Sequence, residues 1–273
     1  MNRTSPLRSL VAATLTATLL LLVTACAHRT ATKQRQNEPN SHSPLASRAL
    51  AHPATQPRST QPASTQSTTR PALPFAAEIE AFEQSDRTNP PPQNAVLFVG
   101  SSSIRLWKSL KEDFPDLTVI NRGFGGSQVA DSVRYANRIV LPYRPKAVVL
   151  YAGDNDLAAG KPPQQVLADF VSFESKVHAA LPRTPVLYLA IKPSIARWNL
   201  IDKIRQTNRM VEDYAKPTNG KVVYVDTFTP ILGPDGQPRR DLLQTDGLHL
   251  NAEGYKLWTP IVRGAIDEAL DGK

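Results

Sequence analysis

The sequence predicts an α/β protein, a single three-layer α/β/α domain built on a roughly five-stranded parallel sheet. Two observations lead to this fold class. Short apolar runs, nearly continuous and rich in β-branched residues, alternate with longer segments of helical periodicity across residues 75–273. Repeated strand–helix units of this length are typical of a parallel sheet with helices on both faces. The roughly 200 residues involved suffice for one domain with a substantial core, and they contain no internal repeat.

Each element follows from its own pattern. Five apolar runs are expected to be strands because they are short and bounded by Pro, Gly or Asn: Ala95–Val99, Leu117–Ile120, Ala147–Tyr151, Val186–Ile191 and Val222–Val225. Helical periodicity predicts helices between these runs and after the last of them: Ile104–Lys111, Gln128–Ile139, Pro163–Ala180, Leu200–Tyr214 and Ala252–Ala269.

The start of the chain carries an export signal. Basic residues precede the apolar run Val11–Val23, and this run is too short to span a bilayer comfortably, so residues 1–25 are predicted to be a signal peptide. Cys26, the sole cysteine of the sequence, follows a Thr-Ala pair that resembles the lipobox of bacterial lipoproteins. The resemblance implies cleavage before Cys26 and its lipidation; an ordinary signal peptide beside a cysteine is the alternative. Ala27 after the cysteine implies the outer membrane if the host is Gram-negative.

Residues 26–74 are expected to be a disordered tether behind the lipidated cysteine. They are crowded with Pro, Ser, Thr, Gln and Ala and have almost no periodic apolar pattern. The charge of the chain is concentrated at this end: residues 1–74 hold eight Lys or Arg and one Glu, whereas residues 75–273 hold 24 basic and 23 acidic residues. A nearly neutral domain gives no reason to expect a nucleic-acid partner.

Four polar or glycine-rich segments fall at the carboxyl ends of predicted strands, or just before the last helix. They are Gly100–Ser103, Asn121–Ser127, Ala152–Asp156 and Asp246–His249. Ligands of parallel sheets bind at this edge, so the four segments are expected to converge there. In the last segment the aspartate is spaced to hold one nitrogen of the histidine ring, which leaves the other nitrogen free to act as a base. A hydroxyl for this base to activate is expected in Gly100–Ser103.

The four segments resemble the four blocks of the SGNH, or GDSL, hydrolases, a family of esterases, lipases and carbohydrate acetylesterases. The resemblance covers residues 94–269 with the blocks in the right order, and it implies the flavodoxin-like SGNH fold. It also implies that Ser102 is the nucleophile, that His249 is its base and that Asp246 orients His249. Amides of Ser102 and Gly126 and the Asn155 side chain would form the oxyanion hole.

One departure from the family pattern concerns the nucleophile. Position 101 is Ser where the family usually has Asp, so Ser101, Ser102 and Ser103 all remain candidates, and spacing from the preceding glycine favours Ser102. Two other functional motifs are excluded because a required glycine is missing from each. Ile104 stands where a nucleophile elbow needs glycine, and Gln128 where a dinucleotide loop needs one. With His178 and His249 as the domain's histidines and no cysteine there, a metal site lacks its usual ligands.

Several neighbouring residues give weaker signals. Asp154 and Asp156 are expected to cap a turn rather than act in the chemistry, and His178 is expected to be solvated on a helix. Substrate contact and local packing both remain open for the residues that follow the first and fourth strands: Arg105, Trp107, Lys192, Trp198 and Asn199.

These observations predict a serine esterase that acts on small acyl esters, with acetyl groups on carbohydrate as the expected substrate and no cofactor or metal. The longer links, Lys192–Asn199 and Thr227–Gln244, contain no long apolar lid, and Trp198 and Ile231 are expected to line a small acyl pocket. The enzyme is expected to be exported and held in the cell envelope by its lipid anchor. The alternatives are a lipase or lysophospholipase of the same family, and a non-catalytic glycan-binding envelope protein.

Overall fold

The computed structural model of this protein describes residues 73–272. The predicted signal peptide, Cys26 and nearly all of the predicted tether lie outside the described residues. Within the described range, no helix combines the length and the apolar character needed to cross a membrane.

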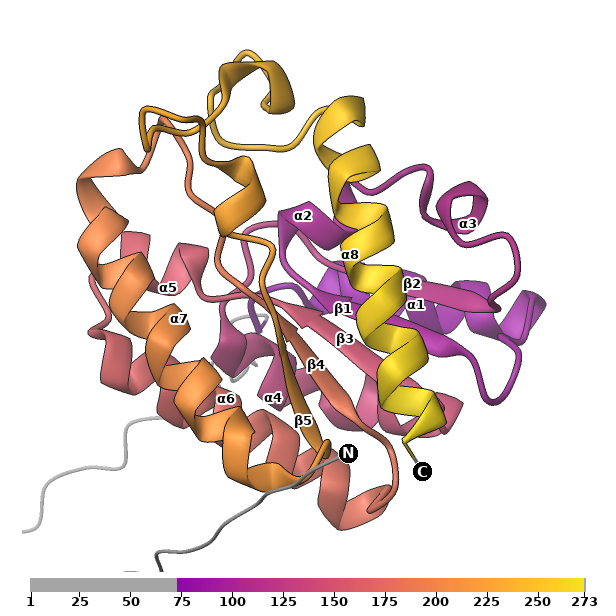
Figure 1. Cartoon of the computed structure of the whole chain (residues 1–273). Helices are drawn as coiled ribbons and strands as arrows, with labels where there is room; N and C mark the ends of the chain where they lie inside the picture. The colour runs from indigo at the N-terminus through magenta and orange to yellow at the C-terminus, as the bar shows by residue number, and fades with distance from the viewer. Residues whose placement is uncertain (1–72, 273) are drawn as a thin grey trace, which may run out of the picture. The chain divides into compact units, whose positions relative to one another are not determined.

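Five parallel strands form one sheet in the order β2-β1-β3-β4-β5 (Figure 1). In register, Val96 of β1 lies opposite Val119 of β2 on one side and Ala147 of β3 on the other. Strands β1, β3 and β4 are buried along their whole length, which accounts for their continuous apolar sequences. The predicted α/β fold with a parallel five-stranded sheet is therefore confirmed. The strands are β1 Val96–Gly100, β2 Val119–Gly123, β3 Ala147–Tyr151, β4 Val186–Leu189 and β5 Val222–Val225.

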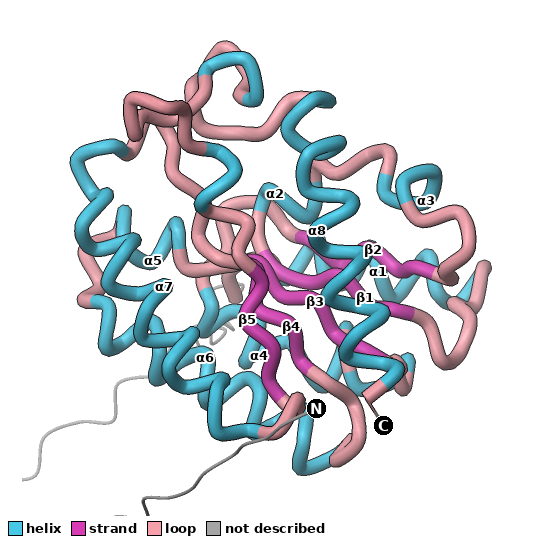
Figure 2. The backbone as a smooth tube through the Cα atoms, in the orientation of Figure 1, coloured by secondary structure: helices cyan, strands magenta, loops and turns pink. Residues whose placement is uncertain are grey.

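Helices cover both faces of the sheet (Figures 1 and 2). Successive side chains of β1 point to opposite faces, so Leu97 belongs to the apolar cluster that includes residues of α1, α4, α6 and α7, whereas Phe98 belongs to the cluster that includes residues of α2, α3 and α8. The helices are α1 Ala76–Thr88, α2 Ser102–Arg105, α3 Leu110–Asp113, α4 Val129–Ile139, α5 Asp154–Ala158, α6 Pro163–Ala180, α7 Ile201–Ala215 and α8 Ala252–Asp271. Single 3₁₀ turns occur at Leu141–Tyr143, Trp198–Leu200, Lys216–Thr218, Thr229–Ile231 and Arg240–Leu242.

The strand order places a topological switch at β1. The chain steps from β1 to β2 in one direction, and β3 lies on the other side of β1. Loops that leave β1 and β3 therefore diverge at the carboxyl edge of the sheet, where ligands of such sheets bind. Gly100–Ser103 and Ala152–Asp156 come from these two loops.

The predicted helix Ile104–Lys111 is wrong as one element, because the structure has α2 and α3 with a turn between them. Trp107 lies in that turn with its side chain 1% exposed, packed against Phe98, Phe114 and Trp258. Its indole Nε1 donates to Asp113 at 2.6 Å. Packing of this large aromatic ring thus decides the backbone course against the local helical pattern.

Helix α1 was not among the predicted helices. Its apolar pattern is weak, with Ile79 its one fully buried residue, and it is fastened by polar contacts to distant positions. Glu83 accepts two hydrogen bonds from Arg138 of α4, at 2.6 and 2.7 Å, and Asp86 pairs with Arg122 of β2. Contacts over such sequence distances leave no periodic signal.

Candidate active site

Ser102 is the accessible member of the serine triplet. Gly100, which ends β1, has φ +127°, and a Cβ there would lie 2.0 Å from the Tyr151 carbonyl oxygen, so only glycine fits this turn. The side chains that follow separate clearly: Ser101 and Ser103 are 1% and 2% exposed, whereas Ser102 is partly exposed. Ser102 begins α2, and its amide therefore has no acceptor within the helix.

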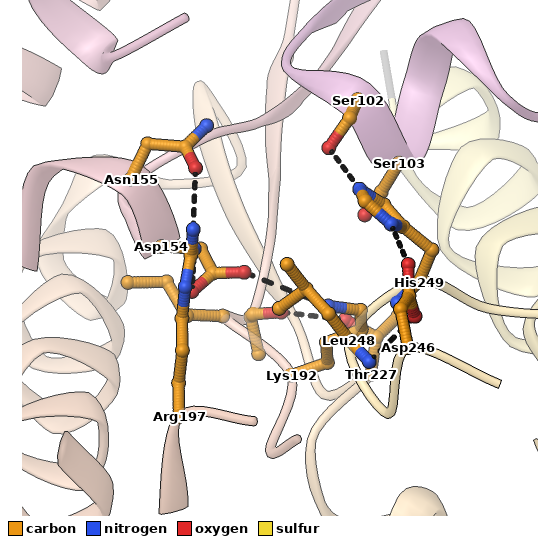
Figure 3. A network of polar contacts seen from close by, with 12 residues as sticks. Ser102, Ser103, Asp154, Asn155, Lys192, Arg197, Thr227, Asp246, Leu248 and His249 are labelled. Atoms are coloured by element: carbon orange, nitrogen blue, oxygen red, sulfur yellow. Dashed lines mark hydrogen bonds and ion pairs between the residues drawn. The ribbon is translucent and has the colours of Figure 1, made fainter. Parts of the chain in front are cut away.

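A hydrogen-bonded relay joins Ser102 to the loop before α8 (Figure 3). The Ser102 Oγ lies 3.0 Å from the His249 Nε2, and the His249 Nδ1 lies 2.6 Å from the Asp246 Oδ2. Because a carboxylate only accepts, Nδ1 carries the proton, and the Nε2 of the neutral ring is free to accept from the Ser102 hydroxyl. This order of donors is the one that a serine nucleophile needs.

The second oxygen of Asp246 fixes the carboxylate to its own turn. Oδ1 accepts from the amides of Leu248 and His249, at 2.9 and 3.0 Å. Burial raises the pKa of Asp246, but the hydrogen bonds from the His249 ring and the two amides outweigh this effect and lower its pKa to about 2. Gly247 supplies the φ of +64° that the turn requires. The Asp246 carboxylate is thus ionised, and Leu248 and His249 of the same turn hold its orientation.

Two further predicted residues, Gly126 and Asn155, follow β2 and β3. Gly126 has φ +80°, and a Cβ there would meet no atom within 4 Å, so its backbone faces open space. The Asn155 Nδ2 donates to the Ser127 carbonyl at 3.0 Å, which ties Asn155 to the residue after Gly126. An amide NH₂ has a second hydrogen, which this bond leaves unused.

Asp156 connects the start of α4, which follows the Gly126 loop, to the segment after β3. Its carboxylate is fully buried, accepts from the Val129 amide at the start of α4 and pairs with Lys161 at 2.9 Å. Burial raises the pKa of Asp156, while Lys161 opposes that change. Asp156 was predicted to cap the turn that follows it. In the structure it instead caps the start of α4, which lies earlier in the chain.

Asn155 is held from its other side by a charged network that sequence reasoning missed (Figure 3). The Arg197 Nη2 donates to the Asn155 Oδ1 at 3.0 Å, and the Arg197 Nη1 lies 2.5 Å from the Asp154 Oδ1. Lys192, 1% exposed, places its Nζ 3.5 Å from the Asp154 Oδ2. Burial lowers the pKa of Lys192, and the Asp154 carboxylate opposes that shift. Because the Asn155 Oδ1 accepts from Arg197, the Nδ2 end of the Asn155 amide is directed away from Arg197.

The loop that carries Lys192 and Arg197 also contacts the Asp246–His249 turn. The Ala196 amide donates to the Gly247 carbonyl at 3.1 Å, and a Cβ on Gly247 would lie 3.2 Å from the Ile195 Cβ. Residues 192–200 thereby connect the asparagine side of the site to the histidine side. The position of Lys192 and Trp198 after the fourth strand gave a weak signal for this loop; nothing in the sequence singled out Arg197.

Some predicted roles need correction. His178 is not solvated: its side chain is 16% exposed, its Nδ1 lies 2.6 Å from the Glu174 Oε2 and its Nε2 lies 3.0 Å from the Thr184 carbonyl. Ile231 is fully buried in the core beneath α8 and does not line a pocket. Trp198 is half-buried, with the guanidinium of Arg205 6.0 Å from its ring centre.

The structure thus brings Ser102, Asp246 and His249 into one relay and links Asn155 of α5 to the loop that carries Gly126. In the described part of the chain, no three His, Cys, Asp or Glu side chains cluster as a metal site requires. The catalytic roles of these residues stay predictions.

Comparison with known proteins gives one family. Residues 98–257 match the GDSL-like Lipase/Acylhydrolase family. A search of curated protein sequences finds no match.

Solved structures of similar fold include a GDSL-like lipase from Bacteroides thetaiotaomicron, at 22% identity and TM-score 0.61 over 71% of this chain and 99% of that one. The lipase/acylhydrolase from Enterococcus faecalis matches at 21% identity and TM-score 0.51, over 66% and 98% of the two chains. A carbohydrate esterase family 3 protein from Talaromyces cellulolyticus matches at 20% identity and TM-score 0.53, over 65% and 98%.

Proposed function

Because the chain belongs to the GDSL-like lipase/acylhydrolase family, we propose that it is a serine esterase that removes small acyl groups, foremost acetyl, from carbohydrate. The observation that carries the proposal is the relay in which the Ser102 Oγ, the two nitrogens of His249 and the Asp246 carboxylate follow one another at 3.0 and 2.6 Å. The accessible hydroxyl, the base and the orienting carboxylate are the three parts that acyl transfer to serine requires.

In this mechanism His249 takes the Ser102 proton as the Oγ attacks the ester carbonyl. Asp246 stabilises the imidazolium that forms, since its pKa of about 2 keeps it ionised throughout. Negative charge on the carbonyl oxygen is received by the amides of Ser102 and Gly126 and by the Asn155 Nδ2. His249 then gives its proton to the leaving alcohol. Water attacks the acyl-enzyme in the same way and releases the acid and free Ser102.

The proposed preference for small acyl groups rests on the surface around the site. Among the described residues, Leu73 is the one large apolar side chain that is exposed, and it lies at the start of the described range. A fatty chain gains about 0.8 kcal/mol per methylene only where apolar wall covers it. With Ile231 in the core and Ile195 packed beside Gly247, the loops offer little such wall.

Two assays test the proposal. A fluorophosphonate probe reacts only with an activated serine, so it should label the parent protein and not Ser102→Ala. Turnover of p-nitrophenyl acetate should exceed that of p-nitrophenyl palmitate. Absence of labelling and turnover would favour the non-catalytic glycan-binding alternative, whereas faster turnover of palmitate would favour a lipase or lysophospholipase.

We also propose that the enzyme is exported and anchored in the cell envelope by a lipidated Cys26, on the lipobox resemblance of the sequence. Cys26→Ser should shift the protein from the membrane fraction to the soluble fraction. A parent protein recovered fully in the soluble fraction after export would contradict the anchor while leaving the esterase proposal intact.

A further inference from the structure

A groove with a cationic lining runs along β2, the edge strand of the sheet, and includes Arg105 at the end of α2. Its volume is about 370 Å³, and it lies against β2 between Phe82 of α1 and the α2–α3 segment. Its charged lining consists of Arg105, Lys108 and Lys111. The mechanism above uses none of these three side chains.

The charged lining of this groove is of one sign. No carboxylate is among its lining residues, and in the described part of the chain none of the three cationic side chains is in an ion pair or a hydrogen bond. The nearby carboxylate of Asp113 is engaged by Trp107 and Ser109. Neighbouring cations behave differently: Arg122 pairs with Asp86, and Arg138 with Glu83. Residues 75–273 carry nearly equal numbers of acidic and basic residues. A groove whose three charged lining residues are all basic therefore departs from the average charge of the domain.

Arg105, which lies one helical turn after Ser102, connects the groove to the loop that carries Gly126. A Cβ on Gly125 would lie 2.7 Å from the Arg105 Nε, so the guanidinium rests beside the residue that precedes Gly126. A Cβ on Gly123 would lie 2.2 Å from the Arg105 amide nitrogen, so the α2 backbone packs directly on the end of β2. A group bound to Arg105 therefore lies next to the Gly125–Gly126 segment, to which the proposed mechanism assigns part of the oxyanion hole.

Polar groups in the groove other than the cations are already engaged. The Asn121 side chain donates to the Ile104 carbonyl at 2.7 Å and accepts from the Gly123 amide at 2.9 Å, and the Trp107 Nε1 donates to Asp113. The donors left for a ligand are the guanidinium and the two ammonium groups. Guanidinium binds the planar pair of oxygens in a carboxylate or phosphate with two parallel hydrogen bonds, and ammonium adds point charge.

Sheet order indicates which part of the ester lies there. The loop of residues 192–200 follows β4, on one side of β1, whereas the groove lies along β2, on the other side. An acyl group as short as acetyl cannot extend from Ser102 along β2, whose five residues span roughly 13 Å at ~3.3 Å per residue. The alcohol part of the ester is the part long enough to do so.

We propose that Arg105, Lys108 and Lys111 form an anion-binding subsite for a carboxylate or phosphate on the alcohol part of the substrate. The proposal rests on the esterase function proposed above and narrows its substrate class to acylated acidic alcohols. An acidic carbohydrate and a phosphorylated glycerol both carry the required oxyanion.

The test compares kcat/KM for matched anionic and neutral acetyl esters. One pair is O-acetylated methyl glucuronoside and its glucuronamide; the other is 1-acetylglycerol 3-phosphate and 1-acetylglycerol. We expect the parent enzyme to prefer an anionic member about tenfold, as for a charge-assisted contact at a partly exposed site. Preference in the first pair alone identifies an acidic carbohydrate, and preference in the second alone a phosphorylated glycerol.

Variants locate the effect. Arg105→Gln should lower the anionic-to-neutral ratio to near one, and Lys108→Gln with Lys111→Gln should lower it partly. Lys203→Gln, which removes an exposed cation of α7 and equals Lys108→Gln in charge, should leave the ratio unchanged. The parent's preference should also fall as NaCl rises from 50 to 500 mM, because surface charge is screened.

Parent ratios near one in both pairs, or a ratio that Arg105→Gln or salt leaves unchanged, would overturn the subsite while neutral turnover upholds the esterase. If neither member of either pair is cleaved and fluorophosphonate does not label Ser102, the proposed function itself fails, and the subsite fails with it.

Discussion

The two sides of the candidate site are built differently. On the histidine side, Asp246 and His249 belong to one short turn, and their side chains are 45% and 23% exposed. On the asparagine side, Asn155 is oriented by Arg197, which is paired in turn with Asp154 and the buried Lys192. Asp154 and Lys192 are 8% and 1% exposed. In the proposed mechanism, proton transfer depends on a local turn near solvent, whereas the Asn155 donor depends on a buried network drawn from α5 and the loop of residues 192–200.

The two sides are therefore expected to respond to different perturbations. A local turn can lose its chemistry with little change in folding, since few other groups depend on it. A buried ion network is costly to break, because removal of one partner leaves another charge without compensation. Substitutions on the asparagine side are therefore expected to combine an effect on turnover with an effect on stability.

The largest expected effect concerns the nucleophile and its base. Ser102→Ala and His249→Ala should each lower kcat for p-nitrophenyl acetate by on the order of 10⁴ or more, because neither attack nor proton transfer proceeds without its partner. Circular dichroism should show both variants folded. Ser101→Ala and Ser103→Ala are the matched controls; loss of activity in either of these with turnover retained in Ser102→Ala would shift the nucleophile by one residue.

The next effect compares the two sides directly. Asp246→Asn should lower kcat about 10⁴-fold, because an amide favours the wrong ring tautomer of His249. Asn155→Ala should lower it by about 10² to 10³, the usual cost of one oxyanion donor. Steady-state kinetics on the same acetyl ester decides the order. Parent-like turnover in Asp246→Asn would contradict its role in the relay.

A smaller effect tests whether Arg197 acts through Asn155. Arg197→Met removes the hydrogen bond to the Asn155 Oδ1 and should lower kcat about tenfold with KM little changed, since the amide loses orientation rather than presence. Arg197→Lys should restore part of the loss. In the Asn155→Ala background the same change should have almost no further effect on kcat, whereas a purely structural role would add its full cost again. Arg209→Met on α7 serves as the control.

The smallest effect is a pH dependence of stability. The pKa of Asp246 is about 2 in the fold, below its ordinary value of 3.8, so its hydrogen bonds stabilise the fold above about pH 4 and lose that contribution as the pH falls toward 2. Asp246→Asn should therefore lower the Tm slightly at pH 5, and the difference from the parent should narrow by pH 2. Asp202→Asn, at a fully solvated position on α7, should show no such narrowing.

The features that could be predicted from the sequence are those with a local sequence pattern. The strands were visible because burial on both faces leaves continuous apolar runs, and Asp246 and His249 because their contact spans three residues. Arg197 was not visible, since its bond to Asn155 crosses 42 positions and a lone arginine in a loop has no pattern. Helix α1 was not predicted for the same reason, since its contacts are also distant in sequence. The predicted helix Ile104–Lys111 is interrupted because Trp107 packs against residues as distant as Trp258.

The loop of residues 192–200 has a consequence for engineering. It contacts Asn155 through Arg197 and the turn before His249 through Ala196 and Gly247, so it behaves as one exchangeable cassette rather than as a set of independent positions. A loop transplanted from a relative would change the contacts to Asn155 and to the turn before His249 at the same time. Libraries that randomise this segment should therefore hold Lys192, Ala196 and Arg197 constant and vary the side chains between and after them.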